Sequence, residues 1–111
     1  MKILNRGFIS IKPTNLYIDW KLNQSQEELI EPENPEATIY LIEEEFWDDE
    51  IILNKYFKKI AQQEFNSIET LENCLPTIET LEDFTKFFHA ELGTFVFDLL
   101  KTPISLENID L

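Results

Sequence analysis

Apolar positions in the first third of the chain come in short runs between polar and proline-containing stretches. Residues 6 to 12 form an apolar run typical of a β-strand, and Pro13 ends it because proline cannot donate to a sheet ladder. Residues 15 to 22 fit a short helix, although their apolar side chains also fit an alternating strand. Residues 23 to 36 contain two prolines and few apolar groups, which predicts a surface loop with room for one turn around residues 27 to 30.

The middle of the chain predicts a strand followed by a long helix. Residues 37 to 43 are apolar on both sides, as expected of a strand that is covered on both faces. Asp48 is placed to cap the helix, with Trp47 and Ile52 as a hydrophobic staple. The expected buried stripe has amphipathic helical spacing and consists of Leu53, Phe57, Ile60, Ala61 and Phe65. The lysines expected on the exposed side are Lys55, Lys58 and Lys59.

A second helix and a final strand are predicted near the end of the chain. Thr80 and Asp83 have the spacing of a capping box at a helix start. Apolar side chains then follow at steps of three and four, which predicts a helix over about 80 to 92 that ends at Gly93. This apolar stripe consists of Leu81, Phe84, Phe88 and Leu92. Residues 94 to 100 predict a strand that Pro103 closes.

The predicted element order is β-α-β-α-α-β. This order indicates an α+β fold in which a single layer of helices packs on a small sheet. A length of 111 residues suits one core, so we expect residues 1 to 111 to form a single domain.

The net charge of the chain limits which classes of partner we expect. The chain has 22 acidic and nine basic residues, for a formal net charge of -13, yet its aromatic content of 13% favours a folded acidic domain over a disordered tail. Sequence-independent binding to nucleic acid depends on lysine and arginine at phosphates, so this composition argues against it. The same negative field should repel anionic membrane surfaces and favour a basic protein as partner.

The single cysteine, Cys74, allows no internal disulfide and no cysteine cluster for zinc. The sequence shows no secretory signal, and its longest apolar run is far shorter than a membrane span. These features predict a cytoplasmic protein.

An acidic run interrupted by two aromatic residues is the sharpest local feature. It consists of Glu43, Glu44, Glu45, Phe46, Trp47, Asp48, Asp49 and Glu50. A calcium loop would need a turn glycine that the run lacks, and acids in a first helical turn complement the helix dipole. The dipole does not account for Glu43 to Glu45, so the run is also a candidate partner-binding surface with Phe46 or Trp47 as its apolar anchor.

No catalytic residue, cofactor site or metal site is predicted. Cys74 and His89 are the available nucleophile and base, but two isolated residues carry almost no information. Two glycines are too few for a phosphate-cradling loop. Asp98 lies between apolar neighbours, where a carboxylate either needs a partner or faces solvent. Five phenylalanines could line an apolar pocket, although their spacing favours the core: Phe84, Phe87, Phe88, Phe95 and Phe97.

Several segments resemble a family of small acidic bacterial proteins without an assigned function. The matching segments are 11–13, 18–20, 38–41, 80–88 around Thr80, Leu81, Phe84, Phe87 and Phe88, and 96–99. None of them is a chemical motif. The resemblance implies a single domain in a bacterial cytoplasm, and it transfers no catalytic residue.

Three functional hypotheses follow from the sequence. The first is a non-enzymatic acidic module that binds another protein, such as an accessory, inhibitor or immunity-like protein. The second is a small enzyme or ligand binder that uses carboxylates at a Phe-lined pocket. The third is a structural subunit of a homo-oligomer.

Overall fold

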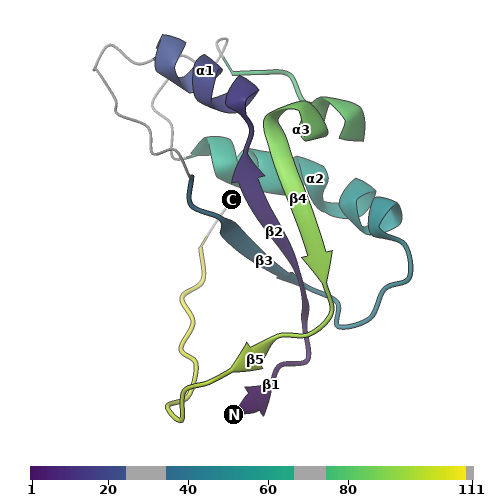
Figure 1. The fold of residues 1–111 in the computed structure, drawn as a ribbon, viewed down its shortest axis with the longest axis vertical. Helices are drawn as coiled ribbons and strands as arrows, with labels where there is room; N and C mark the ends of the chain where they lie inside the picture. The colour runs from purple at the N-terminus through teal and green to yellow at the C-terminus, as the bar shows by residue number, and fades with distance from the viewer. Residues whose placement is uncertain (25–34, 67–74, 110–111) are drawn as a thin grey trace.

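The computed structural model describes residues 1–24, 35–66 and 75–109. Its elements are β1 (Lys2–Ile3), β2 (Gly7–Pro13), α1 (Asn15–Gln24), β3 (Thr38–Ile42), α2 (Asp49–Asn66), α3 (Leu81–Phe87), β4 (Phe88–Gly93) and β5 (Phe97–Asp98). Helices pack on one face of a three-stranded sheet, and a two-stranded ribbon extends from the far end of the molecule (Figure 1). The predicted α+β class is confirmed, although the strands form two small sheets where one was expected.

Strand β2 is the centre of the larger sheet, with β3 and β4 antiparallel on either side. Ile9 pairs with Tyr40 on one side and Leu92 on the other, so these three side chains share a face. Ile9 and Ile11 are fully buried on this face. The central strand therefore supplies the floor on which the helices pack.

Aromatic side chains from α2, α3 and β4 fill the space above that floor. Phe84 and Phe88 are the largest fully buried side chains, and their rings lie 5.1 Å apart. Phe65 of α2 contacts both Phe88 and Tyr17, with ring centroids 5.5 and 5.7 Å apart. One aromatic cluster thus joins all three helices to the sheet.

The buried stripe of α2 is largely as predicted. The buried residues are Ile52, Phe57, Ile60, Ala61 and Phe65, whereas Leu53 is only partly buried. The strand predicted over 6 to 12 is confirmed as β2, although β2 starts at Gly7 and includes Pro13, and the helix reading of 15 to 22 is confirmed as α1. The turn predicted around 27 to 30 and Cys74 lie outside the described residues.

The helix predicted over 80 to 92 is wrong in its second half. Thr80 and Asp83 form the predicted capping box, but α3 ends at Phe87 and the chain continues as β4. Phe88 and Leu92 belong to the helical stripe, but with Ala90 between them they also fit the two-residue period of a strand. Pairing with β2 along the whole of β4 selects the strand.

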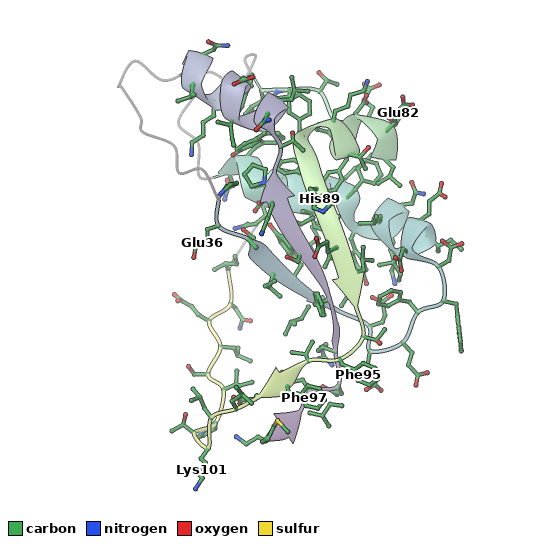
Figure 2. All side chains as sticks on the ribbon, viewed as in Figure 1. Glu36, Glu82, His89, Phe95, Phe97 and Lys101 are labelled. Carbon is green, nitrogen blue, oxygen red and sulfur yellow. The ribbon has the colours of Figure 1, made fainter. Side chains whose placement is uncertain are left out.

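The prediction that residues 37 to 43 are covered on both faces is also wrong. Ile39 and Leu41 are 55% and 52% exposed, since helices cover only the opposite face of the sheet. His89 lies on the same open face, where it pairs with Lys12 (Figure 2). The strand predicted over 94 to 100 shortens to Phe97–Asp98.

The two glycines lie where the sheet meets the ribbon. A Cβ at Gly7 would lie 2.7 Å from the carbonyl oxygen of Glu43 and 2.9 Å from that of Gly93. A Cβ at Gly93 would lie 2.4 Å from the ring of Phe8, the residue of β2 that pairs with Gly93. Both glycines therefore allow close backbone or ring approach.

The ribbon pairs the start of the chain with a segment near its end. Lys2 is opposite Asp98, and the amide of Leu4 donates to the carbonyl of Val96 at 2.8 Å. Phe95 and Phe97 stack on it with centroids 6.4 Å apart, and both are exposed (Figure 2). Other exposed apolar side chains of the ribbon and the following segment are Met1, Ile3, Leu99, Leu100, Ile104, Leu106 and Ile109.

Candidate functional site

The acidic run from Glu43 to Glu50 leads from the end of β3 into the first turn of α2. Its eight residues do not form one surface. Some of them serve the fold, and others face solvent beside the ribbon.

Glu43 is tied to α2. Its carboxylate accepts a hydrogen bond from Lys55 at 2.7 Å and another from the hydroxyl of Tyr56. These hydrogen bonds, chiefly that from Lys55, lower the pKa of Glu43 from 4.5 to about 2. Because its charge is matched within the chain, Glu43 is less available to a partner than its sequence position suggests.

The acids at the other end of the run stabilise the helix start. The side chain of Asp48 accepts from the amides of Glu50 at 2.9 Å and Ile51 at 3.3 Å, which confirms the predicted cap. Asp49 and Glu50 lie in the first turn, where negative charge complements the helix dipole. The predicted staple is wrong, because Trp47 is fully exposed while Ile52 is buried.

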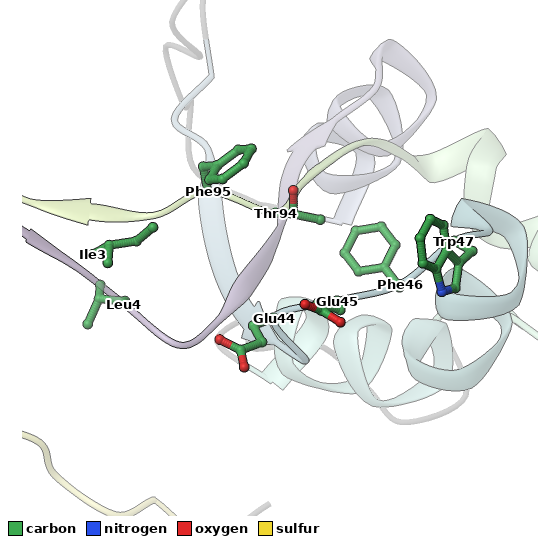
Figure 3. Close-up of a pocket in the computed structure, with 8 residues that line it drawn as sticks. All are labelled: Ile3, Leu4, Glu44, Glu45, Phe46, Trp47, Thr94 and Phe95. Carbon is green, nitrogen blue, oxygen red and sulfur yellow. The ribbon is translucent and has the colours of Figure 1, made fainter.

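The remaining residues border a concavity of about 440 Å³ next to the ribbon. Figure 3 shows Phe46 between Trp47 and Thr94, with Glu44 and Glu45 along one side. We call this surface the acidic-aromatic site. Its lining residues are Ile3, Leu4, Glu44, Glu45, Phe46, Trp47, Thr94 and Phe95.

The two aromatic residues of the run differ in their role. Phe46 is partly buried, packs against the core and lies close to Gly7. Trp47 is 100% exposed. Of the two predicted anchors, Trp47 is the one whose whole apolar surface is open to a partner.

Half of the acidic-aromatic site was not found in the sequence. Ile3, Leu4, Thr94 and Phe95 reach it because β1 pairs with β5 and brings both ends of the chain beside the acidic run. No local pattern signals this pairing. The available signal was the density of apolar residues between 95 and 100, of which Phe95 and Phe97 were expected in the core.

The other candidate residues do not converge. His89 is exposed on the open face of the sheet, with its Nε2 3.2 Å from Glu91, and Cys74 lies outside the described residues. Asp98 does have partners, since it accepts from the amide of Leu100 at 2.9 Å and lies 3.9 Å from the ammonium of Lys2.

The phenylalanines predicted as core divide into two groups. Phe84 and Phe88 are fully buried and Phe87 packs against the core, as predicted. Phe95 and Phe97 are exposed on the ribbon, so the core prediction is wrong for them. The five rings therefore do not line one pocket.

Over the described parts of the chain, no three His, Cys, Asp or Glu side chains gather as a group that could hold a metal ion. No helix within the described ranges is long and apolar enough to cross a membrane.

Comparison with known proteins gives no relative. No family model, curated protein or solved structure matches this chain.

Proposed function

We propose that this chain is a non-enzymatic protein-binding module that recognises a basic surface of another protein through the acidic-aromatic site. The observation that carries the proposal is the full exposure of Trp47 beside Glu44 and Glu45 at the edge of a concavity. Tryptophan is among the residues that most often supply binding energy at interfaces.

The charge of the chain supports a basic partner. A formal charge of -13 steers cationic surfaces toward the protein, and complementary charge raises the association rate at low salt. An accessory, inhibitor or immunity-like role is compatible with this proposal. The sequence resemblance implies a bacterial cytoplasm and no particular role.

The enzyme alternative has less support. It needs carboxyl groups of raised pKa at a Phe-lined pocket, as in sites that hold a proton for catalysis. Hydrogen bonds lower the pKa of Glu43 and of Asp83, which is the opposite of the shift that this alternative needs. The most buried phenylalanines, Phe84 and Phe88, pack in the core.

A homo-oligomeric subunit is a second candidate, which the exposed apolar side chains of the ribbon favour. Phe95 and Phe97 are 71% and 52% exposed. Neighbouring exposed apolar side chains of this kind mark surfaces that contact another protein. The mass of the protein in solution tests it, since a monomer at high concentration would exclude this role.

Affinity capture with matched variants tests the main proposal. The wild-type protein and Trp47→Ala would be immobilised and exposed to bacterial lysate, and captured proteins would be purified and their dissociation constants measured. We expect Trp47→Ala to weaken binding of a basic partner about tenfold or more. Ile51→Ala, an exposed apolar change one turn into α2, is the control that should leave binding unchanged.

Salt provides the second arm of the test. Replacing Glu44 and Glu45 with glutamine should slow association and flatten its dependence on ionic strength. A captured partner that binds Trp47→Ala as tightly as the wild type, and that is indifferent to salt, would refute the proposed site.

A further inference from the structure

A second surface lies along the outer edge of the sheet, where β3 leads into the acidic run. Strand β3 is the last strand on its side of the three-stranded sheet, and a groove of about 430 Å³ runs between it and α2. The groove is lined mainly by apolar groups, including Ile39, Leu41, Tyr56, Ile60, Gln63 and Ile109. We call it the β3 groove.

An edge strand offers a row of backbone groups to another strand. Alternate N–H and C=O groups of β3 point away from β2, and in the described structure no strand pairs with them. The exposed side chains of Ile39 and Leu41 lie beside this edge. An added strand would satisfy the backbone groups and cover part of that apolar surface.

A buried polar atom at the groove lacks a partner. The side-chain carbonyl oxygen of Gln63 is buried and accepts no hydrogen bond. A buried acceptor without a donor costs free energy, and rotation of the Gln63 amide toward a ligand in the groove would remove this cost. A ligand in the groove could therefore satisfy two kinds of group, the side-chain oxygen of Gln63 and the outward backbone groups of β3.

The described part of the chain's own C-terminal segment does not fill the site. Its last described residues approach β3 in Figure 1, and Ile109 lines the groove. However, residues 103 to 109 have no regular secondary structure, and Ile104 and Leu106 are 62% and 83% exposed. The segment lies near the edge without pairing to it.

The charges at the ends of β3 distinguish between the two remaining occupants, a second copy of this chain and a segment of another protein. Glu36 precedes the strand, and Glu43 and Glu44 follow it. In an antiparallel pair of two β3 strands related by a two-fold axis at Tyr40, Glu36 of one copy would face Glu44 of the other, while Glu43 is already paired with Lys55. Like charges that face each other across paired strands repel, so self-pairing is disfavoured.

We infer that the β3 groove binds an extended segment of another protein by strand addition. In this segment apolar residues alternate with polar ones, and lysine or arginine stands at each end. Apolar side chains would cover Ile39 and Leu41, and the terminal cations would face Glu36 and Glu44. The inferred strand-addition site shares Glu44 with the border of the acidic-aromatic site, but the inference does not depend on Trp47 or on the proposed function.

A synthetic peptide of about ten residues tests the inference, with valine and threonine alternating between lysines at both ends. Its affinity for the full chain would be measured by fluorescence polarisation, and hydrogen exchange would report on the amides of 38 to 42. We expect saturable binding, slower exchange in β3, and about tenfold weaker binding to the double variant Ile39→Ser, Leu41→Ser.

Two controls separate strand addition from other binding. A peptide with the same side chains but methylated backbone nitrogens cannot form the ladder, so it should not bind. The protein variant Ile51→Ser, changed at an exposed apolar residue of α2, should bind the unmodified peptide as the wild type does. Trp47→Ala should also bind it normally, which keeps this test distinct from that of the proposed function.

Several results would overturn the inference. Equal affinity of the methylated peptide would show that the groove binds apolar side chains without strand addition. No binding at about 1 mM peptide would show that the groove is not a peptide-binding site. Slow β3 exchange without peptide would identify the occupant as the C-terminal segment in a monomer, or as a second copy if the mass doubles.

Discussion

At the scale of single residues, the structure assigns different roles to neighbours that look equivalent in the sequence. Six acids lie between residues 43 and 50, yet Glu43 binds Lys55 and Tyr56, and Asp48 caps a helix. Glu44 and Glu45 border the concavity. The cap was predictable because it depends on positions three or fewer residues away. The partners of Glu43 lie in α2, 12 and 13 residues later in the chain.

The hydrogen bonds of Glu43 predict a pH-dependent contribution to stability. Its pKa in the folded protein is about 2, below the ordinary 4.5, so the ionised form stabilises the fold. This contribution is present above about pH 4.5 and is lost as the pH falls toward 2. We expect Glu43→Gln to destabilise the protein at neutral pH, and the difference from the wild type to shrink over that interval.

Urea denaturation at a series of pH values measures this difference. Glu44→Gln is the matched control, and its effect on the free energy of unfolding should be small at neutral pH. A Glu43→Gln variant as stable as the wild type at pH 7 would show that the hydrogen bonds to Lys55 and Tyr56 contribute nothing net.

At the scale of secondary structure, local patterns located the elements better than they located their ends. The region from Leu81 to Leu92 was expected to be one helix because its apolar residues keep helical spacing. Phe88 satisfies both periods, and the choice between them is made by β2, a strand more than 70 residues earlier. Likewise, apolar residues on both sides of β3 did not reveal that only one face is covered.

The short helix α3 depends strongly on its cap. Its seven residues are too few for intrinsic helix formation, and the Thr80 side chain accepts from the amide of Asp83 at 3.1 Å while Asp83 accepts from that of Thr80 at 3.2 Å. We expect Thr80→Ala to lower the free energy of unfolding by about 0.5 to 2 kcal/mol in chemical denaturation.

Thr85→Ala provides the comparison for this prediction. Thr85 lies within the same helix, where its hydroxyl donates to the carbonyl of Glu82, and alanine favours helix there. A loss of stability at Thr85 as large as that at Thr80 would argue against a special role for the cap.

At the scale of the whole molecule, the predicted element order indicated the class of fold and the net charge indicated the sign of the electrostatic field. Neither located the surface that carries the candidate site. The acidic-aromatic site takes Ile3 and Leu4 from the start of the chain and Phe95 from near its end. These residues meet through the β1–β5 pairing, which has no local sequence signature.

The net charge predicts an unusual response to salt. A charge of -13 on 111 residues opposes compaction through self-repulsion, which dissolved ions screen. We expect the melting temperature to rise between about 10 mM and 0.5 M NaCl, even though salt weakens the exposed pair of Lys55 and Glu43. Calorimetry across this range checks it, and a falling melting temperature would mean that specific ion pairs outweigh the overall repulsion.

The β1–β5 ribbon also constrains when the fold can be completed. Lys2 donates to the carbonyl of Lys101, which lies 99 positions later. At a synthesis rate of about 5 to 20 residues per second, Lys2 is synthesised roughly 5 to 20 s before Lys101. Until β5 has been synthesised, β1 is an unpaired edge, and the ribbon, with the part of the acidic-aromatic site that it supplies, can form only after β5 has emerged from the ribosome.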